Sequence, residues 1–116
     1  MKGYARLLIR VSAAAWISAG TPAIASPHTD AECREGGEFI RHAARARDYG
    51  MPRERFMNQL EADLRAIQAF VPELRWFARD ASDEQMLIEH AGRVFDLPLD
   101  PLQHENQFLT ACMPQA

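Results

Sequence analysis

The chain has 116 residues, 47% of them hydrophobic and 25% charged, and its formal net charge at pH 7 is −3. A chain of this length holds one domain at most, which excludes multidomain enzymes, TIM barrels and two-lobed kinases. The lack of a basic excess argues against a nucleic-acid partner and against binding to anionic lipid.

The first 25 residues have the pattern of a cleaved secretory signal peptide. Their basic residues are Lys2, Arg6 and Arg10. An apolar stretch follows at residues 11–19, and Ala23-Ile24-Ala25 supplies the small residues that a signal peptidase reads. The apolar stretch is shorter than the roughly 20 residues of a spanning helix, so we expect cleavage after Ala25 and no stable membrane anchor afterwards. Residues 26–116 are then a single helical domain, periplasmic or secreted.

Cleavage makes the domain more acidic, because it removes three of the 13 basic residues and none of the 16 acidic ones, giving a net charge of −6. The chain contains two cysteines, Cys33 and Cys112. In an exported protein such a pair predicts one disulfide rather than a metal or redox pair, since no C-x-x-C motif is present. A closed loop of about 80 residues contributes about 4–5 kcal/mol in the chain-entropy model. The pairing also predicts that the first and last helices lie side by side.

The first predicted helix starts at a T-x-x-E capping box formed by Thr29 and Glu32. It runs to about Tyr49 and ends at Gly50, a residue type typical of the position after a helix. Its inner stripe comprises Cys33, Gly37, Ile40 and Ala44. Gly36 and Gly37 lower helix propensity, and we expect them to permit the close approach of a neighbouring helix rather than to act as a hinge.

The second predicted helix has Pro52 in its first turn. Its apolar stripe comprises Phe56, Leu60, Leu64, Ile67 and Val71. Pro72 is expected to interrupt or restart this helix, with residues 73–79 continuing as a short kinked segment. We predict four helices in the whole domain, or five if this segment is counted separately.

The third predicted helix is capped by Ser82 with Gln85 in the capping-box position. Its apolar side comprises Met86, Leu87, His90, Ala91, Val94 and Phe95. Residues 97–101 form a tight connector in which Asp100 caps and Pro101 opens a fourth helix that runs to about Cys112. We therefore predict an all-α bundle whose first and last helices are joined by the disulfide.

Groups that perform catalysis are scarce in residues 26–116. The serines and threonines there are Ser26, Thr29, Ser82 and Thr110, and no G-x-S-x-G, phosphate-loop or H-E-x-x-H motif occurs. The pairs Glu38–His42 and Met86–His90 each share a helix face, but a metal site needs three or four convergent ligands. We therefore predict no catalytic, cofactor-binding or metal-binding residues.

One segment has the composition of a protein-binding surface. Tryptophan and arginine dominate interface hot spots, and Trp76 stands between Arg75 and Arg79 after a proline. Residues 80–116 carry seven acidic residues and one basic residue. This half of the chain is either an ordinary solvated face or a docking surface for a basic partner. Trp76 either fills the end of the bundle or contacts that partner. The candidate partner surface comprises Arg75, Trp76, Arg79, Asp83 and Glu84.

Four features together resemble small exported helical proteins of proteobacteria. They are a cysteine early in the first helix, Cys33, the stretch Ala46–Pro52 with its R-D-x-G helix ending, the proline-containing connector Leu97–Pro101, and the late F-x-x-x-C from Phe108 to Cys112. More distantly, the layout is similar to HdeA-type periplasmic chaperones and to the periplasmic immunity proteins that neutralise type VI secretion effectors. The resemblance implies a small helical exported protein, and most proteins of the first group have no assigned activity.

Three hypotheses follow for function. The first is an exported, non-catalytic domain that binds another protein, in the manner of an immunity protein or inhibitor. The second is an acid-stress chaperone, because carboxylate protonation would leave the arginines and histidines to repel one another and loosen the bundle while the disulfide limits its expansion. The third, a small enzyme or metal carrier, is disfavoured by the missing nucleophiles and ligand sets.

Overall fold

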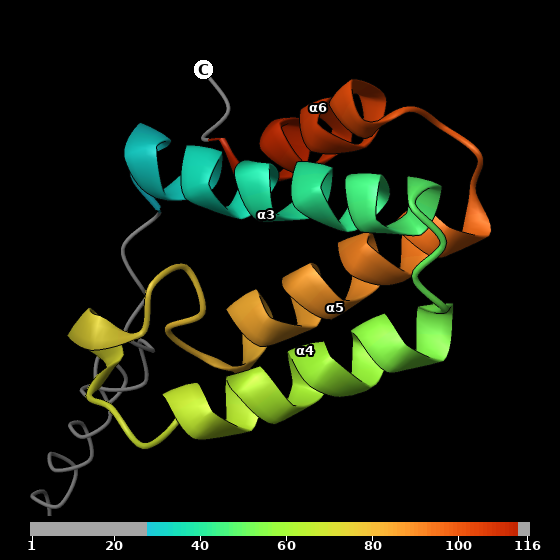
Figure 1. Ribbon diagram of the computed structural model, residues 1–116. Helices are drawn as coiled ribbons and strands as arrows, with labels where there is room; N and C mark the ends of the chain where they lie inside the picture. Colours follow the sequence, from blue (N-terminus) through green and yellow to red (C-terminus); the bar gives the residue numbers. More distant parts are fainter. Residues whose placement is uncertain (1–27, 114–116) are drawn as a thin grey trace, which may run out of the picture.

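The computed structural model describes residues 28–113 (Figure 1). The predicted signal peptide and its cleavage site lie outside the described residues. Every regular element between residues 28 and 113 is a helix, which confirms the predicted all-α fold. The elements are α3 (Asp30–Asp48), α4 (Arg53–Ile67), the 3-10 helix η1 (Pro72–Leu74), α5 (Ala81–Asp96) and α6 (Pro101–Cys112).

The four α-helices form a bundle in which α3 is the shared element. It packs most extensively against α6 and next against α5, while α4 packs on the other side of α5 (Figure 1). The predicted disulfide between Cys33 and Cys112 joins α3 to the end of α6, with the two Cα atoms 5.7 Å apart. Disulfides form and persist in oxidising compartments, so this bond indicates an exported protein.

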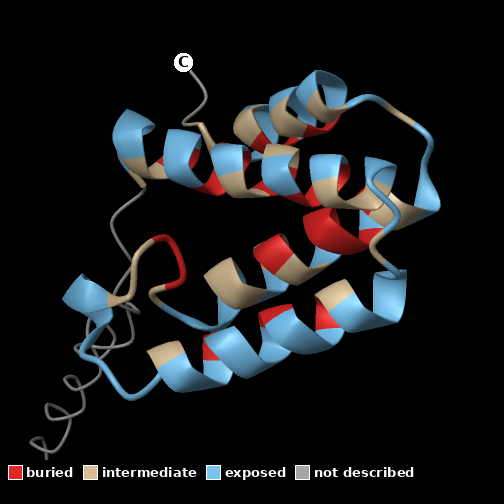
Figure 2. Cartoon of the chain, viewed as in Figure 1, coloured by how far each residue is buried: buried red, intermediate tan, exposed pale blue. Residues whose placement is uncertain are grey.

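The inner faces of the helices meet in one apolar core (Figure 2). Its fully buried large side chains include Ile40 of α3, Phe77 of the loop before α5, Leu87 of α5 and Phe108 of α6. The predicted close approach at the glycines is confirmed. A Cβ atom at Gly36 would lie 2.5 Å from the Phe108 ring, so α6 approaches α3 more closely there than any larger residue would allow.

The capping predictions are confirmed at α3 and α6. The Glu32 amide donates to Thr29 Oγ1 at 3.1 Å and the Thr29 amide donates to Glu32 Oε1 at 2.9 Å. This backbone donor is the main reason that the pKa of Glu32 lies below its usual value. Asp100 and Gln103 form the equivalent capping box at the start of α6, where Pro101 occupies the first turn.

Three predicted boundaries are wrong. Helix α5 is capped by Asp80, whose carboxylate accepts from the Asp83 amide at 2.9 Å, rather than by Ser82, because a carboxylate binds more strongly to the positive end of a helix. Pro52 is the N-cap of α4 and precedes its first turn. Helix α4 ends at Ile67, so Val71 is outside its stripe, and residues 73–79 do not continue as a helix beyond the 3-10 turn.

The connector between α5 and α6 is organised by one arginine of α3. The Arg47 guanidinium donates to the carbonyl oxygens of Val94 at 2.7 Å, Leu97 at 3.1 Å and Leu99 at 2.8 Å. These oxygens belong to the last turn of α5 and to the residues after it, where no further helical amide is available to satisfy them. Arg47 therefore fixes the direction in which the chain leaves α5 and enters α6.

Candidate protein-interaction surface

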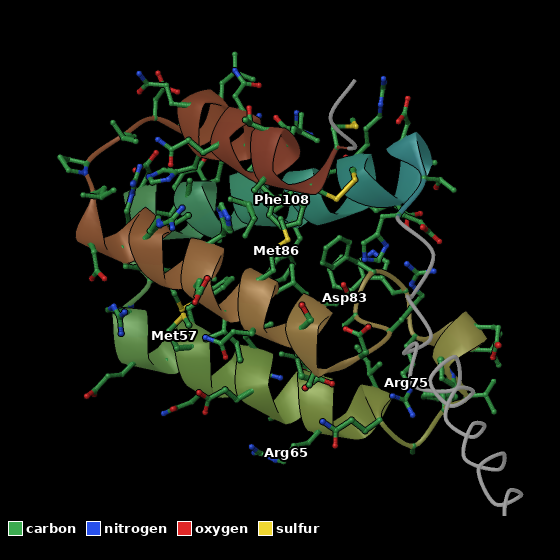
Figure 3. All side chains as sticks on the ribbon, turned by 180° about the vertical axis from the view of Figure 1, so that it is seen from behind. Met57, Arg65, Arg75, Asp83, Met86 and Phe108 are labelled. Atoms are coloured by element: carbon green, nitrogen blue, oxygen red, sulfur yellow. A yellow bond between two sulfur atoms is a disulfide. The ribbon has the colours of Figure 1, made fainter. Side chains whose placement is uncertain are left out.

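The five residues predicted to form a partner surface lie together at one end of the bundle. Arg75, Trp76 and Arg79 belong to the loop between η1 and α5, and Asp83 and Glu84 belong to the first turn of α5. Figure 3 shows Arg75 beside this loop, with Asp83 nearby on α5. The structure therefore brings the predicted residues together, although several of them are engaged within the chain.

Arg75 and Glu84 are both bonded to the segment that follows α4. The Arg75 guanidinium donates to the carbonyl oxygens of Phe70 at 2.6 Å, Gln68 at 3.2 Å and Arg79 at 3.4 Å. Both carboxylate oxygens of Glu84 accept from Gln68 Nε2 at 3.1 Å. Arg75 thus gives a donor to two carbonyls, at and just beyond the end of α4, that no helical amide reaches.

Asp83 and Arg79 form a polar cluster with His28, a residue that the sequence analysis did not select. Asp83, whose side chain is only 14% exposed, lies 2.8 Å from His28 Nε2 and accepts from the Arg79 amide at 3.1 Å. His28 Nδ1 lies 3.1 Å from Arg79 Nη2 and 3.2 Å from Glu32 Oε1. The ring also stacks on Phe77, with the centroids 4.2 Å apart.

The hydrogen-bond chemistry of this cluster depends on the protonation of His28. A neutral ring with its proton on Nε2 donates to Asp83 and accepts from Arg79 at Nδ1, whereas a protonated ring donates to both Asp83 and Glu32. In either form the cluster ties the residues just before α3 to α5 and to the loop. Its position explains why Asp83 is largely withdrawn from solvent.

Trp76 adopts a backbone conformation that is rare for a bulky residue. Its φ of +58° lies in the left-handed region, which costs about 1–2 kcal/mol for a residue with a Cβ atom. The half-buried indole makes edge contacts with Phe39, at a centroid distance of 5.6 Å, and with Phe77, at 6.2 Å. Trp76 therefore covers the end of the aromatic core and still presents part of its surface to solvent.

An exposed apolar segment precedes Trp76. Phe70 is 54% exposed, Val71 57% and Leu74 69%. We call residues 70–74 the apolar loop. This feature was not predicted from the sequence, because Val71 fits the helical spacing of the apolar stripe of α4. The early end of the helix at Ile67 instead leaves Phe70 and Val71 exposed to solvent. Large exposed apolar patches are common at protein–protein interfaces.

A groove of about 260 Å³ lies between α3 and α4. Its lining is mainly apolar and includes Phe39, Met51, Phe56 and Leu60, while Arg55, Gln59 and Asp63 provide its polar groups. We call this feature the α3–α4 groove. Phe39 joins it to the loop before α5, since the same ring contacts both Phe56 and Trp76.

Two histidines are buried in the core, away from this surface. His104 lies with its Nε2 atom 3.1 Å from the Leu97 carbonyl oxygen and 3.4 Å from Arg47 Nη1. His90 makes an edge contact with Phe108 at a centroid distance of 5.3 Å. Both side chains thus lie where α5 and α6 meet α3.

Burial lowers the pKa of His90 below the ordinary value of 6.5. The positive charge of Arg93 acts in the same direction, Glu89 acts against it, and His104 lowers it further. The neutral form of His90 is therefore favoured by the fold.

Between residues 28 and 113, no three His, Cys, Asp or Glu side chains converge as a metal site would require. In the same range, no helix combines the length and apolar character needed to cross a membrane. Comparison of the chain with protein-family models, with curated proteins and with solved structures gave no match.

Proposed function

We propose that the protein is an exported, non-catalytic domain that binds another protein in the periplasm, in the manner of an immunity protein or inhibitor. The observation that carries the proposal is the apolar loop, in which Phe70, Val71 and Leu74 are each more than half exposed. Leaving three large apolar side chains in water is unfavourable, and a partner that covers them recovers that free energy.

The surroundings of the loop support the same proposal. Trp76 follows it directly and offers a partly exposed indole, the side chain most enriched at interface hot spots. Arg75 donates to the backbone carbonyls of Phe70, where the loop begins, and of Gln68 and Arg79, which flank it, so the loop is already shaped before a partner arrives. A preformed loop loses less conformational entropy on binding than one that must be ordered.

The test is a pull-down with the oxidised, tagged protein at neutral pH, read by mass spectrometry. The informative variant is Val71→Asp with Leu74→Asp, and the matched control is Leu102→Asp, because Leu102 of α6 is 58% exposed and lies outside the loop. We expect the wild type and the control to capture the same stoichiometric protein and the loop variant to lose at least about tenfold in affinity. Equal capture by the loop variant would reject the proposed surface.

The second candidate function is an acid-stress chaperone, which the buried His90 favours. Protonation of His90 places a charge beside Phe108 in the core. Acid therefore loosens the contact of α6 with its neighbours, while the Cys33–Cys112 disulfide keeps the end of α6 attached to α3. Light scattering of an aggregating client protein at low pH tests this function, and the absence of protection at equimolar protein rejects it.

A further inference from the structure

The apolar loop and the α3–α4 groove are complementary features of one molecule. The loop presents Phe70, Val71 and Leu74 outward, and the groove presents an apolar lining with room for one or two large side chains. Both border the same helix, because the groove is lined from Arg55 to Asp63 along α4 and the loop follows the end of α4 at Ile67. A single chain thus carries both a set of exposed apolar side chains and an apolar groove that could receive them.

Charges beside the two features are also complementary. Arg55 borders the groove, Glu73 lies within the loop, and both side chains are exposed. In the described part of the chain, neither residue takes part in an ion pair. A molecule with a carboxylate next to an apolar side chain would make two contacts here. Its carboxylate would form an ion pair with Arg55, and its apolar side chain would fill the α3–α4 groove.

We propose that a second copy of this chain is that molecule. Two copies related by a two-fold axis each insert the apolar loop into the α3–α4 groove of the other, with Glu73 facing Arg55 across the interface. The contact is self-complementary, as a two-fold interface must be, so every favourable interaction occurs twice.

The layout of α4 makes this reciprocal contact possible. Helix α4 has 15 residues and is therefore about 22 Å long. The groove begins near its N-terminal end and the loop lies beyond its C-terminal end (Figure 1). When two such helices lie antiparallel, the loop of each copy comes to the groove of the other.

The size of the contact predicts a weak dimer. Three side chains and one ion pair from each copy cover less than the roughly 800 Å² per partner of a standard stable interface. We therefore expect a dissociation constant in the micromolar range or weaker, on the order of 10–500 μM. The dimer covers the same loop that the proposed function assigns to another protein, but self-association does not require that this other protein exists.

Sedimentation equilibrium of the oxidised protein at neutral pH, over a wide concentration range, tests the proposal. We expect a monomer–dimer equilibrium that is weakened about tenfold or more in Arg55→Glu and in Glu73→Arg, and restored in the double variant that exchanges the two charges. The control is Arg34→Glu, an exposed arginine of α3 that lies beside Glu105 and Leu109 of α6. A monomer at every concentration, or single and double variants that associate like the wild type, overturns the proposal.

The Arg55→Glu variant also separates this proposal from the proposed function. It leaves the apolar loop and Trp76 unchanged, so it is expected to lose self-association and to keep capture of a partner in the pull-down. Loss of both in a folded Arg55→Glu protein, as judged by circular dichroism, would show that the captured partner also contacts the groove, and would overturn the assignment of partner binding to the apolar loop alone. Thermal unfolding of each variant confirms that its fold is intact.

Discussion

The ring of Phe108 in α6 occupies the space that a side chain at Gly36 of α3 would need. A Cβ atom at residue 36 would lie 2.5 Å from Cζ and 2.6 Å from Cε1 of that ring. Phe108 is fully buried and also contacts Phe77 and His90, so it has little room to move away. This contact sets the separation of the two helices that the disulfide joins.

Gly36→Ala is therefore expected to destabilise the protein, although alanine favours helix formation over glycine by about 1 kcal/mol. Overpacking typically costs 1–3 kcal/mol, and a 2.5 Å contact with a fixed aromatic ring places the cost at about 2–3 kcal/mol. After the gain in helix propensity we expect a net loss of about 1–2 kcal/mol in urea unfolding. Gly92→Ala is the matched control, because its Cβ would meet only the end of the Arg53 side chain, at 3.0 Å. A Gly36→Ala protein as stable as the Gly92→Ala protein would contradict the packing described here.

Removal of the disulfide is expected to remove much of the stability of the domain. The bond closes a sequence separation of 79 residues, for which the chain-entropy model gives about 4–5 kcal/mol. Cys33→Ala with Cys112→Ala should lower the free energy of unfolding by that amount, and the reduced wild type should behave like the double variant. Equal melting temperatures for the oxidised wild type and the double variant would show that the bond contributes nothing.

Mild acid is expected to destabilise the fold through His90. Its pKa in the folded protein is lower than the ordinary 6.5 expected after unfolding, so below about pH 6.5 the unfolded chain binds a proton that the folded chain does not. The contribution of His90 to the free energy of unfolding is therefore greatest above pH 6.5. It falls as the pH drops toward the pKa of His90 in the folded protein, with a slope of at most about 1.4 kcal/mol per pH unit.

The measurement is the free energy of unfolding between pH 7.5 and pH 5. His90→Gln should show a shallower loss of stability than the wild type over this range. His42→Gln, which removes an exposed histidine of α3, should keep the wild-type slope. An unchanged slope in His90→Gln would mean that this side chain is not the acid-sensitive group.

The left-handed backbone of Trp76 predicts an unusual order of stability among its variants. Both Trp76→Ala and Trp76→Gly lose the ring contacts with Phe39 and Phe77, but only glycine adopts a φ of +58° without strain. We therefore expect Trp76→Gly to be more stable than Trp76→Ala by about 1 kcal/mol in thermal or urea unfolding. The opposite order would indicate that the backbone at this residue is not left-handed.

Arg47 is expected to stabilise the fold through the geometry of its guanidinium and not through its charge alone. Arg47→Lys keeps the charge, but an ammonium cannot reach the carbonyls of Val94, Leu97 and Leu99 together. We expect a loss of about 1–3 kcal/mol on chemical denaturation, because the part-buried carbonyls of Val94 and Leu99 cannot both keep their donor. The matched control is Arg45→Lys, on the exposed side of α3, which should be neutral.

Local signals explain why much of the fold was predictable. The capping boxes at Thr29 and Asp100 lie within four residues of the atoms they satisfy, so their sequence pattern is sufficient. The disulfide was predictable because the chain offers one possible pair, and the close helix approach because two adjacent glycines have few other uses in a helix.

The candidate surface was less predictable, because it depends on contacts between distant residues. Helix α4 stops early where Arg75 supplies donors to Gln68 and Phe70, and a sequence pattern does not reveal which carbonyls an arginine will reach. That early end turns Val71 outward and creates the apolar loop. His28 was missed for the same reason, since its contact with Asp83 spans 55 residues.

The most direct test of the account is a hydrogen-exchange footprint of the oxidised protein, alone and with the protein that it captures. If the apolar loop and Trp76 form the binding surface, added amide protection should concentrate in residues 68–79 and leave the exposed face of α6 unchanged. Protection confined to α6, or no change between residues 68 and 79 when the partner is bound, would contradict the central claim.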